Sequence, residues 1–261
     1  MKSLVLFTLI FWSGFSIASS TSYYELQEVS EFTQGDVRDE NLMRYISDVS
    51  HRAFHPLGYK RGTKPALFGD IDLDRDENGY FVKDVYCNYK IRHRVGPNRI
   101  PNNNTMNTEH TWPQSKGSRR EPFRGDLHHL FPTDSKANSK RGNFPFGEVD
   151  GKPVSSSCTA SQAGFIINPE TGRTSGKRGY QPPAEHRGNV ARALFYSAGF
   201  YNKHISEMEE HYLKKWNRED PVDAFEVERN DEIQEAQGNR NPFIDFPEMA
   251  ERVTDFELFV I

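Results

Sequence analysis

Apolar residues recur at steps of three and four along residues 39–54, which is the spacing of one helix face. The positions are Leu42, Met43, Ile46, Val49 and Ala53. The same pattern predicts helices at residues 189–201 and about 205–216. Pro and Gly interrupt residues 55–79 repeatedly, so we expect loops there. Tyr, Phe and Val in residues 80–91 instead favour a strand.

Two short apolar segments in the middle of the chain, residues 108–112 and 127–131, predict a pair of strands joined by a basic loop. After Pro132, either Thr133 or Asp134 can cap a short helix that runs to about Arg141. Residues 143–187 are rich in Gly, Pro and Ser and are expected to be mostly loop. The mixture of predicted helices and strands favours an α+β fold. No internal repeat or low-complexity linker divides the chain, which favours a single domain.

The N-terminus has the features of an export signal. Lys2 precedes an almost uncharged apolar run from Leu4 to Ile17, and Ser16 and Ala18 fit a signal-peptidase site. The run is too short for a comfortable membrane span. We therefore expect a signal peptide at 1–18 and a mature, secreted or periplasmic domain at 19–261 without membrane contact. An N-terminal anchor or a buried strand is the alternative.

Charge is distributed unevenly along the chain. The net charge is -4, and a mean hydropathy of -0.78 with 27% charged and 13% aromatic residues is typical of a soluble, folded protein. Residues 90–141 hold eleven Lys or Arg against four Asp or Glu, whereas residues 201–261 hold seven against sixteen. The basic middle indicates a site for a polyanion, and the acidic end an ordinary solvated surface.

The two cysteines, Cys87 and Cys158, are expected to form a disulfide in an oxidising compartment. Two free buried thiols are the alternative reading. Neither cysteine lies in a CxxC pair, so the sequence does not favour a zinc site.

Asp74, Asp76, Asn78 and Gly79 match the opening of a calcium-binding loop. Such a loop supplies a bidentate Glu at its twelfth position, where this chain has Val85. Half a motif favours a polar turn over a calcium site.

Chemically active side chains concentrate in three neighbouring segments. They are Asn107–Ser115, Gly125–Pro132 and Asn138–Asn143. Together they offer imidazoles, carboxylates, amides and guanidiniums. Hydrolysis of a phosphodiester requires a base for water, a hard cation on the phosphate oxygens and positive charge for the transition state.

These segments resemble the endonuclease I family of bacterial periplasmic and secreted nucleases, which belongs to the ββα-metal, or His-Me finger, nucleases. The likeness rests on E-H-x-x-P at 109–113, D-L-H-H-L-x-P at 126–132 and N-S-x-R-G-N at 138–143. It continues at 187–196 and 216–243 and spans roughly residues 40–245. The resemblance implies a ββα-metal core surrounded by helices and long loops.

The resemblance also implies the roles of three residues. His110 would be the general base, and Glu109 and Asn138 would bind Mg²⁺, with Mn²⁺ or Ca²⁺ as substitutes. Asn143 is the rival ligand to Asn138. Adjacent strand residues point to opposite faces, so Glu109 and His110 can share a site only if the strand ends or bulges there. A histidine base predicts activity that rises through a pKa of roughly 6–7.

The roles of the arginines are less defined by the sequence. In the family, an Arg of the inter-strand loop steadies the reacting phosphate, which favours Arg119 as a catalytic residue and Arg120 as a substrate contact. Arg141 and Arg192 are the other predicted substrate contacts. On the second strand, Asp126, His128 and His129 could equally serve structure, and at most one of the two histidines should face the site.

The function expected from the sequence is a monomeric, metal-dependent endonuclease that cleaves DNA, and RNA as well, with little sequence preference and leaves 5′-phosphates. Two alternatives lack catalysis: a secreted nucleic-acid-binding module and a calcium-dependent surface-binding protein. Intact Glu109, His110 and Asn138 favour the enzyme.

Overall fold

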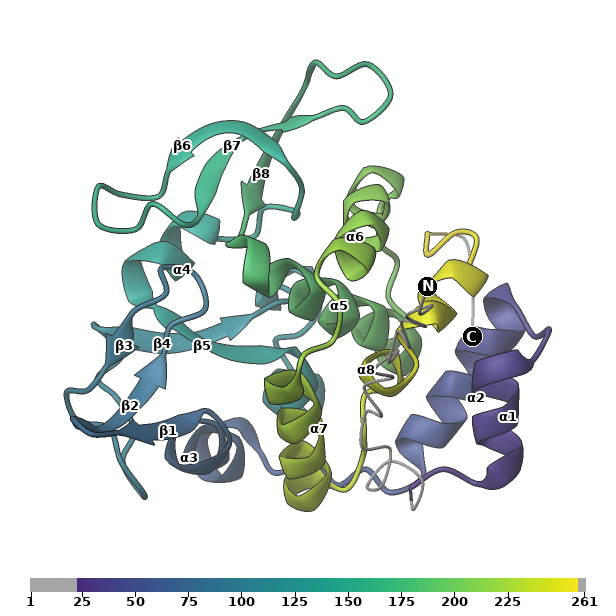
Figure 1. Ribbon diagram of the computed structural model, residues 1–261, viewed down its shortest axis with the longest axis horizontal. Coiled ribbons are helices and arrows are strands. Elements are labelled where there is room, and N and C mark those ends of the chain that lie inside the picture. Colours follow the sequence, from purple (N-terminus) through teal and green to yellow (C-terminus); the bar gives the residue numbers. More distant parts are fainter. Residues whose placement is uncertain (1–22, 258–261) are drawn as a thin grey trace, which may run out of the picture.

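The computed structural model of the chain describes residues 23–257, so the expected signal peptide lies outside the described residues. The fold is α+β, as predicted: small antiparallel sheets lie beside a group of helices (Figure 1). The strands are β1 (Leu73–Asp76), β2 (Gly79–Lys83), β3 (Lys90–Ile91), β4 (Met106–His110), β5 (Leu130–Asp134), β6 (Val149–Pro153), β7 (Gln162–Ile167) and β8 (Thr174–Gln181). The helices are α1 (Leu26–Gln34), α2 (Asp39–His51), α3 (Lys64–Ala66), α4 (Ser135–Arg141), α5 (Arg187–Tyr201), α6 (Glu207–Glu219), α7 (Ala224–Gln237) and α8 (Pro242–Asp245). Within residues 23–257, no helix has the length and apolar character needed to cross a membrane.

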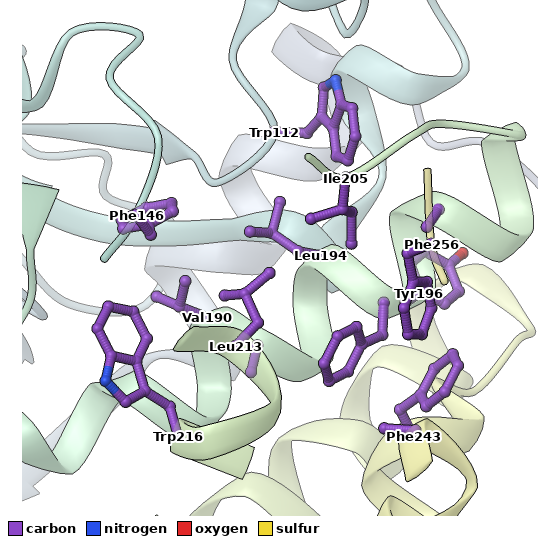
Figure 2. Packing of buried hydrophobic residues seen from close by; sticks show 14 of the residues in the cluster. Trp112, Phe146, Val190, Leu194, Tyr196, Ile205, Leu213, Trp216, Phe243 and Phe256 are labelled. Carbon is purple, nitrogen blue, oxygen red and sulfur yellow. The ribbon is translucent and has the colours of Figure 1, made fainter. Parts of the chain in front are cut away.

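Helix α5 forms the centre of the main core. It is buried on almost every side, as expected for a helix without a distinct polar face. Figure 2 shows Val190 and Leu194 of this helix among large side chains that come from other elements, including Trp216 of α6 and Phe243 of α8. The predicted helices at 39–54, 189–201 and 205–216 correspond to α2, α5 and α6.

The strand–strand–helix unit predicted in the middle of the chain is present. β4 pairs with β5 in an antiparallel register in which Met106 lies opposite Asp134 and His110 opposite Leu130. Asp134 caps α4, because its carboxylate accepts hydrogen bonds from the backbone N–H groups of Lys136 and Ala137. The strands begin and end at other residues than the pattern predicted.

Residues 127–129 are a 3-10 helix rather than part of the second strand. Asp126 precedes it, and its carboxylate accepts the backbone N–H of His128 at 3.0 Å. This side-chain bond competes with the strand ladder, so β5 begins only at Leu130.

Two loop predictions were wrong. Residues 59–71 form consecutive helical turns around α3, which bury Leu67, Phe68 and Ile71. Pro65 is tolerated because it lies in the first turn of α3.

The second wrong loop prediction concerns residues 143–187, which contain the sheet β6–β7–β8. Glycine is required there by close approach of the strands. A Cβ on Gly164 would lie 2.2 Å from the carbonyl oxygen of Asp150. The predicted strand at 80–91 is also divided, into β2 and β3.

The Asp-rich stretch forms the β1–β2 hairpin. Asp76 is held by Lys90 at 3.0 Å and Arg92 at 2.6 Å, so its charge is already compensated by protein groups. This is the polar turn that the half motif favoured.

The predicted disulfide is present between Cys87 and Cys158. It connects the segment between β2 and β3 with the segment between β6 and β7.

Candidate active site

A cleft with a volume of about 740 Å³ opens beside the end of β4. Its walls come from β4, α4, the inter-strand loop and the helical turns after Gly58. Its polar side chains include Tyr59, Lys60, Lys64, Asn107, Glu109, His110, Gln114, Arg124, Asn138, Arg141 and Asn143. The three residues predicted as base and metal ligands therefore line one cleft.

The imidazole of His110 has a hydrogen-bond partner at each nitrogen. Nε2 donates to the carbonyl oxygen of Arg124 at 3.2 Å, and Nδ1 accepts from the side-chain amide of Gln114 at 3.4 Å. Donation through Nε2 leaves a lone pair on Nδ1. β4 ends at His110, which lets the side chains of Glu109 and His110 line the same cleft.

Burial keeps His110 neutral. Burial is the largest cause and the neighbouring His129 the next, and the net effect is that the pKa of the imidazole falls from 6.5 to about 3. The two rings lie 5.5 Å apart between centroids. The free protein thus holds the imidazole in its neutral form well below neutral pH, and its pKa is lower than the sequence led us to expect.

Glu109 is a buried carboxylate whose charge is supported by Arg141. Its Oε1 accepts the hydroxyl of Tyr86 at 2.9 Å and lies 3.0 Å from Nη1 of Arg141. Burial raises the pKa of Glu109, while Arg141 and Tyr86 oppose that shift. Both contacts use Oε1, so Oε2 is the oxygen that remains for a ligand.

Arg141 also connects α4 to the end of β4. Its guanidinium donates to the carbonyl oxygens of His110 at 3.1 Å and Thr111 at 2.7 Å. Only 1% of Arg141 is exposed. These contacts position Glu109 and His110. Arg141 also lines the cleft, so its predicted contact with substrate stays a prediction.

Asn138 is oriented by its amide nitrogen. Nδ2 donates to Oδ1 of Asn107 at 2.7 Å and to the carbonyl oxygen of Thr108 at 3.2 Å. The protein thereby uses the donor end of the amide and leaves Oδ1 for a ligand. The rival, Asn143, is exposed and donates to Ser115 at 3.3 Å.

Arg124 is the inter-strand arginine that lines the cleft. Its guanidinium lies 4.7 Å from the centre of the Tyr59 ring, and its Nε has no hydrogen-bond partner although it is buried. Arg119 and Arg120, which the sequence favoured, are exposed and do not line the cleft. The inter-strand loop therefore does bring an arginine to the cleft, but a different one.

Comparison with known proteins supports the resemblance to the endonuclease I family. The family model for Endonuclease I matches residues 41–248. The chain belongs to the endonuclease I family.

Curated relatives carry nuclease names. The chain is 34% identical over 122 residues to an extracellular deoxyribonuclease of Aeromonas hydrophila, covering 46% of this chain and 49% of that protein. It is 33% identical over 167 residues to an extracellular ribonuclease of Bacillus amyloliquefaciens, covering 56% and 53%. It is 31% identical over 131 residues to a periplasmic deoxyribonuclease of Aeromonas hydrophila, covering 50% and 51%. The chain thus spans about half the length of these relatives.

The oxygen atoms in the cleft of this endonuclease I family member suit a hard divalent cation. Oε2 of Glu109 and Oδ1 of Asn138 are the kind of ligands that Mg²⁺ accepts together with several waters and a phosphate oxygen. Residues 23–257 contain no group of three or more His, Cys, Asp or Glu that could hold a metal. A cation here would therefore rely on one carboxylate, one amide, water and substrate.

Arg192 does not line the cleft. It is fully buried, and its Nε and Nη2 donate to Glu226 at 2.7 and 2.5 Å. Its Nη1 donates to Asn217 and to the carbonyl oxygen of Asp220. The predicted substrate contact is therefore not supported, and Arg192 joins α5 to α6 and α7.

The remaining polar residues of the second segment also serve the structure. Asp126 accepts the hydroxyls of Tyr196 at 2.7 Å and Tyr201 at 2.8 Å. Nε2 of His128 donates to Asn239, and Nε2 of His129 donates to Phe123. Neither histidine lines the cleft.

Sequence reasoning missed the wall that carries Tyr59, Lys60 and Lys64. The basic pair Lys60–Arg61, followed by Lys64, was available as a signal, but the surrounding glycines and prolines suggested a loop. This wall adds two cations to the cleft.

Proposed function

We propose that this chain is an exported, metal-dependent endonuclease that hydrolyses phosphodiester bonds of DNA and RNA without sequence preference. The observation that carries the proposal is the placement of a neutral His110, held through Nε2, in one cleft with free oxygens of Glu109 and Asn138. The names of the deoxyribonuclease and ribonuclease relatives support both substrates.

In this proposal, the attacking water replaces the long hydrogen bond from Gln114 at Nδ1 of His110, and Nδ1 takes a proton from that water. Nε2 stays bonded to the Arg124 carbonyl, which maintains the tautomer and the ring orientation. The phosphodiester raises the pKa of the imidazole as it binds, because an adjacent anion favours the charged ring. The bound phosphate thereby makes the imidazole a stronger proton acceptor than it is in the free protein, while the cation opposes this shift.

Glu109 and Asn138 would hold the cation, with Mg²⁺ as the expected metal and Mn²⁺ or Ca²⁺ as possible substitutes. When bound, such an ion stabilises negative charge on the phosphate and on the leaving 3′ oxygen. Arg124, Lys60 and Lys64 would attract and hold the backbone phosphates. Contacts to phosphates alone carry no sequence information, which is the basis for non-specific cleavage.

Incubation with supercoiled plasmid and with structured RNA tests the proposal. We expect both to be degraded to fragments with 5′-phosphate ends in Mg²⁺, and to stay intact in EDTA or with His110→Ala. Cleavage that persists in EDTA, or a discrete set of sites on random DNA, would refute it.

For export, intact mass analysis of secreted material is expected to show an N-terminus near Ser19.

A further inference from the structure

A second groove lies on the other side of α4 from the cleft. Its volume is about 750 Å³, and its walls come from α4 and from the connection between β6 and β7. Ser139 of α4 lines both the cleft and the groove, so the two adjoin across a single helix. The proposed hydrolysis makes no use of this groove.

The sequence of α4 distributes its side chains to three different places. Ala137 and Arg141, one turn apart, are buried. Asn138 lies on the cleft, whereas Lys136 and Lys140, also one turn apart, are exposed and line the groove. One short helix therefore presents an amide to the cleft and two ammonium groups to the groove.

The two lysines give the groove a positive character. Neither makes an ion pair with any residue between 23 and 257. The carboxylate that lines the groove, Asp134, accepts the backbone N–H groups of Lys136 and Ala137 through Oδ1, each at 2.9 Å. The ammonium groups are thus available to an anion from outside.

The opposite wall offers hydroxyl groups on a fixed backbone. Ser155 and Ser157 line it, and their hydroxyl oxygens lie 3.2 Å apart, so one hydroxyl donates to the other and the second hydrogen is left for a ligand. The Cys87–Cys158 disulfide anchors this segment, the Tyr89 hydroxyl donates to the carbonyl oxygen of Ser157, and the N–H of Cys158 donates to Ser155 Oγ at 3.0 Å. A wall fixed in this way loses little freedom when a ligand binds.

We propose that this groove binds the phosphodiester backbone of nucleotides that flank the scissile bond, on the same strand that crosses the cleft. The inference rests on the function proposed for the cleft. Lysines neutralise phosphates and serine hydroxyls donate to their oxygens without reading bases. The groove therefore increases the affinity for chains long enough to cross α4, and leaves the chemistry at His110 unchanged.

The test compares the parent with Lys136→Gln/Lys140→Gln on a labelled single-stranded DNA of about 20 nucleotides, long enough to cover more than one such site. Binding is measured by fluorescence anisotropy in EDTA across a range of salt, and cleavage separately in Mg²⁺. We expect Kd to rise about tenfold at low salt and the salt slope to fall by about 1.4, since each phosphate contact on a single strand contributes about 0.7. KM should rise while kcat stays at the parental value.

Arg38→Gln/Arg44→Gln is the matched control, because it also removes two positive charges. Both arginines are exposed and lie in the α1–α2 region, on the opposite side of the molecule from α4 (Figure 1). The control should keep the parental Kd, salt slope and KM. Equal values for the two double variants would overturn the proposal, as would a lower kcat with unchanged KM. Failure of the parent to cleave DNA would refute the proposed function, whereas the binding measurement would still decide the role of the groove.

Discussion

Burial of His110 determines the pH below which its imidazole becomes protonated. His110 is 6% exposed, and burial together with His129 lowers its pKa to about 3. The sequence could identify His110, because the Glu-His pair and the Pro after it form a local motif. It could not supply the pKa, because His129 and Arg124 approach His110 only through the fold of the inter-strand loop.

The pH dependence of kcat/KM follows from this depressed pKa, since kcat/KM reports the free enzyme. We expect kcat/KM to change little from pH 8 to about pH 6 and to fall only at lower pH, where His110 becomes protonated. Initial rates on short duplex DNA at saturating Mg²⁺ would measure this profile. A half-maximal value near pH 6.5 would contradict the buried, neutral state of the ring.

The sequence and the structure differ most clearly in which arginine they assign to the cleft. Arg124 lies in the cleft, so we expect Arg124→Gln to reduce kcat by about 10²–10³-fold, the usual effect of losing one donor to developing charge. The matched substitution Arg119→Gln removes the same charge from an exposed position and should leave kcat within about twofold, as surface substitutions usually have small effects. The opposite ranking in steady-state assays would restore Arg119 as the phosphate ligand.

At the scale of elements, the β4–β5–α4 unit could be predicted because its pattern is local. The two short apolar segments, Pro132 and the capping residue Asp134 all lie within one short stretch. The helical turns at 59–71 and the sheet β6–β8 could not be predicted. Their Gly and Pro residues are typical of loops in a sequence, but in the structure they allow close packing between segments. Gly151 is an example, since a Cβ at this position would lie 2.6 Å from the carbonyl oxygen of Ala163.

The cap of α4 is a test at this scale. Asp134→Ala leaves the N–H groups of Lys136 and Ala137 without their side-chain acceptor, so we expect the free energy of unfolding to fall by about 1 kcal/mol. Urea denaturation would measure it, with Asp150→Ala on the exposed edge of β6 as the control. Equal stabilities of the two variants would show that the cap contributes nothing.

At the scale of the whole molecule, buried polar groups join distant segments. Asp126 lies at the centre of one such network: it accepts hydrogen bonds from Tyr196 and Tyr201, at the end of α5, and from Gln237, at the end of α7. Residues separated by as many as 111 positions meet there. No local pattern reports such contacts, which is why the sequence left the role of Asp126 open.

One buried histidine of this network tests the electrostatics of folding. Burial lowers the pKa of His128 to about 4 from 6.5, so between these values the unfolded chain binds a proton that the folded chain does not. The contribution of neutral His128 to the free energy of unfolding is therefore complete well above pH 6.5 and is lost as the pH falls towards 4. Between pH 8 and pH 5, the parent should lose about 2 kcal/mol more than His128→Gln in urea denaturation. Parallel losses in the two proteins would contradict the depressed pKa.

The division of labour between His110 and Asn138 is tested most directly by titrating Mg²⁺ against the activity of two variants. We expect Asn138→Ala to lose activity at low Mg²⁺ and to recover part of it as Mg²⁺ is raised, because mass action restores the occupancy of a weakened site. His110→Ala should lose about 10²–10⁴-fold at every Mg²⁺ concentration, because added cation does not replace proton transfer. Recovery of His110→Ala but not of Asn138→Ala would reverse the assignment of base and ligand, and full activity in both would place the reaction outside this cleft.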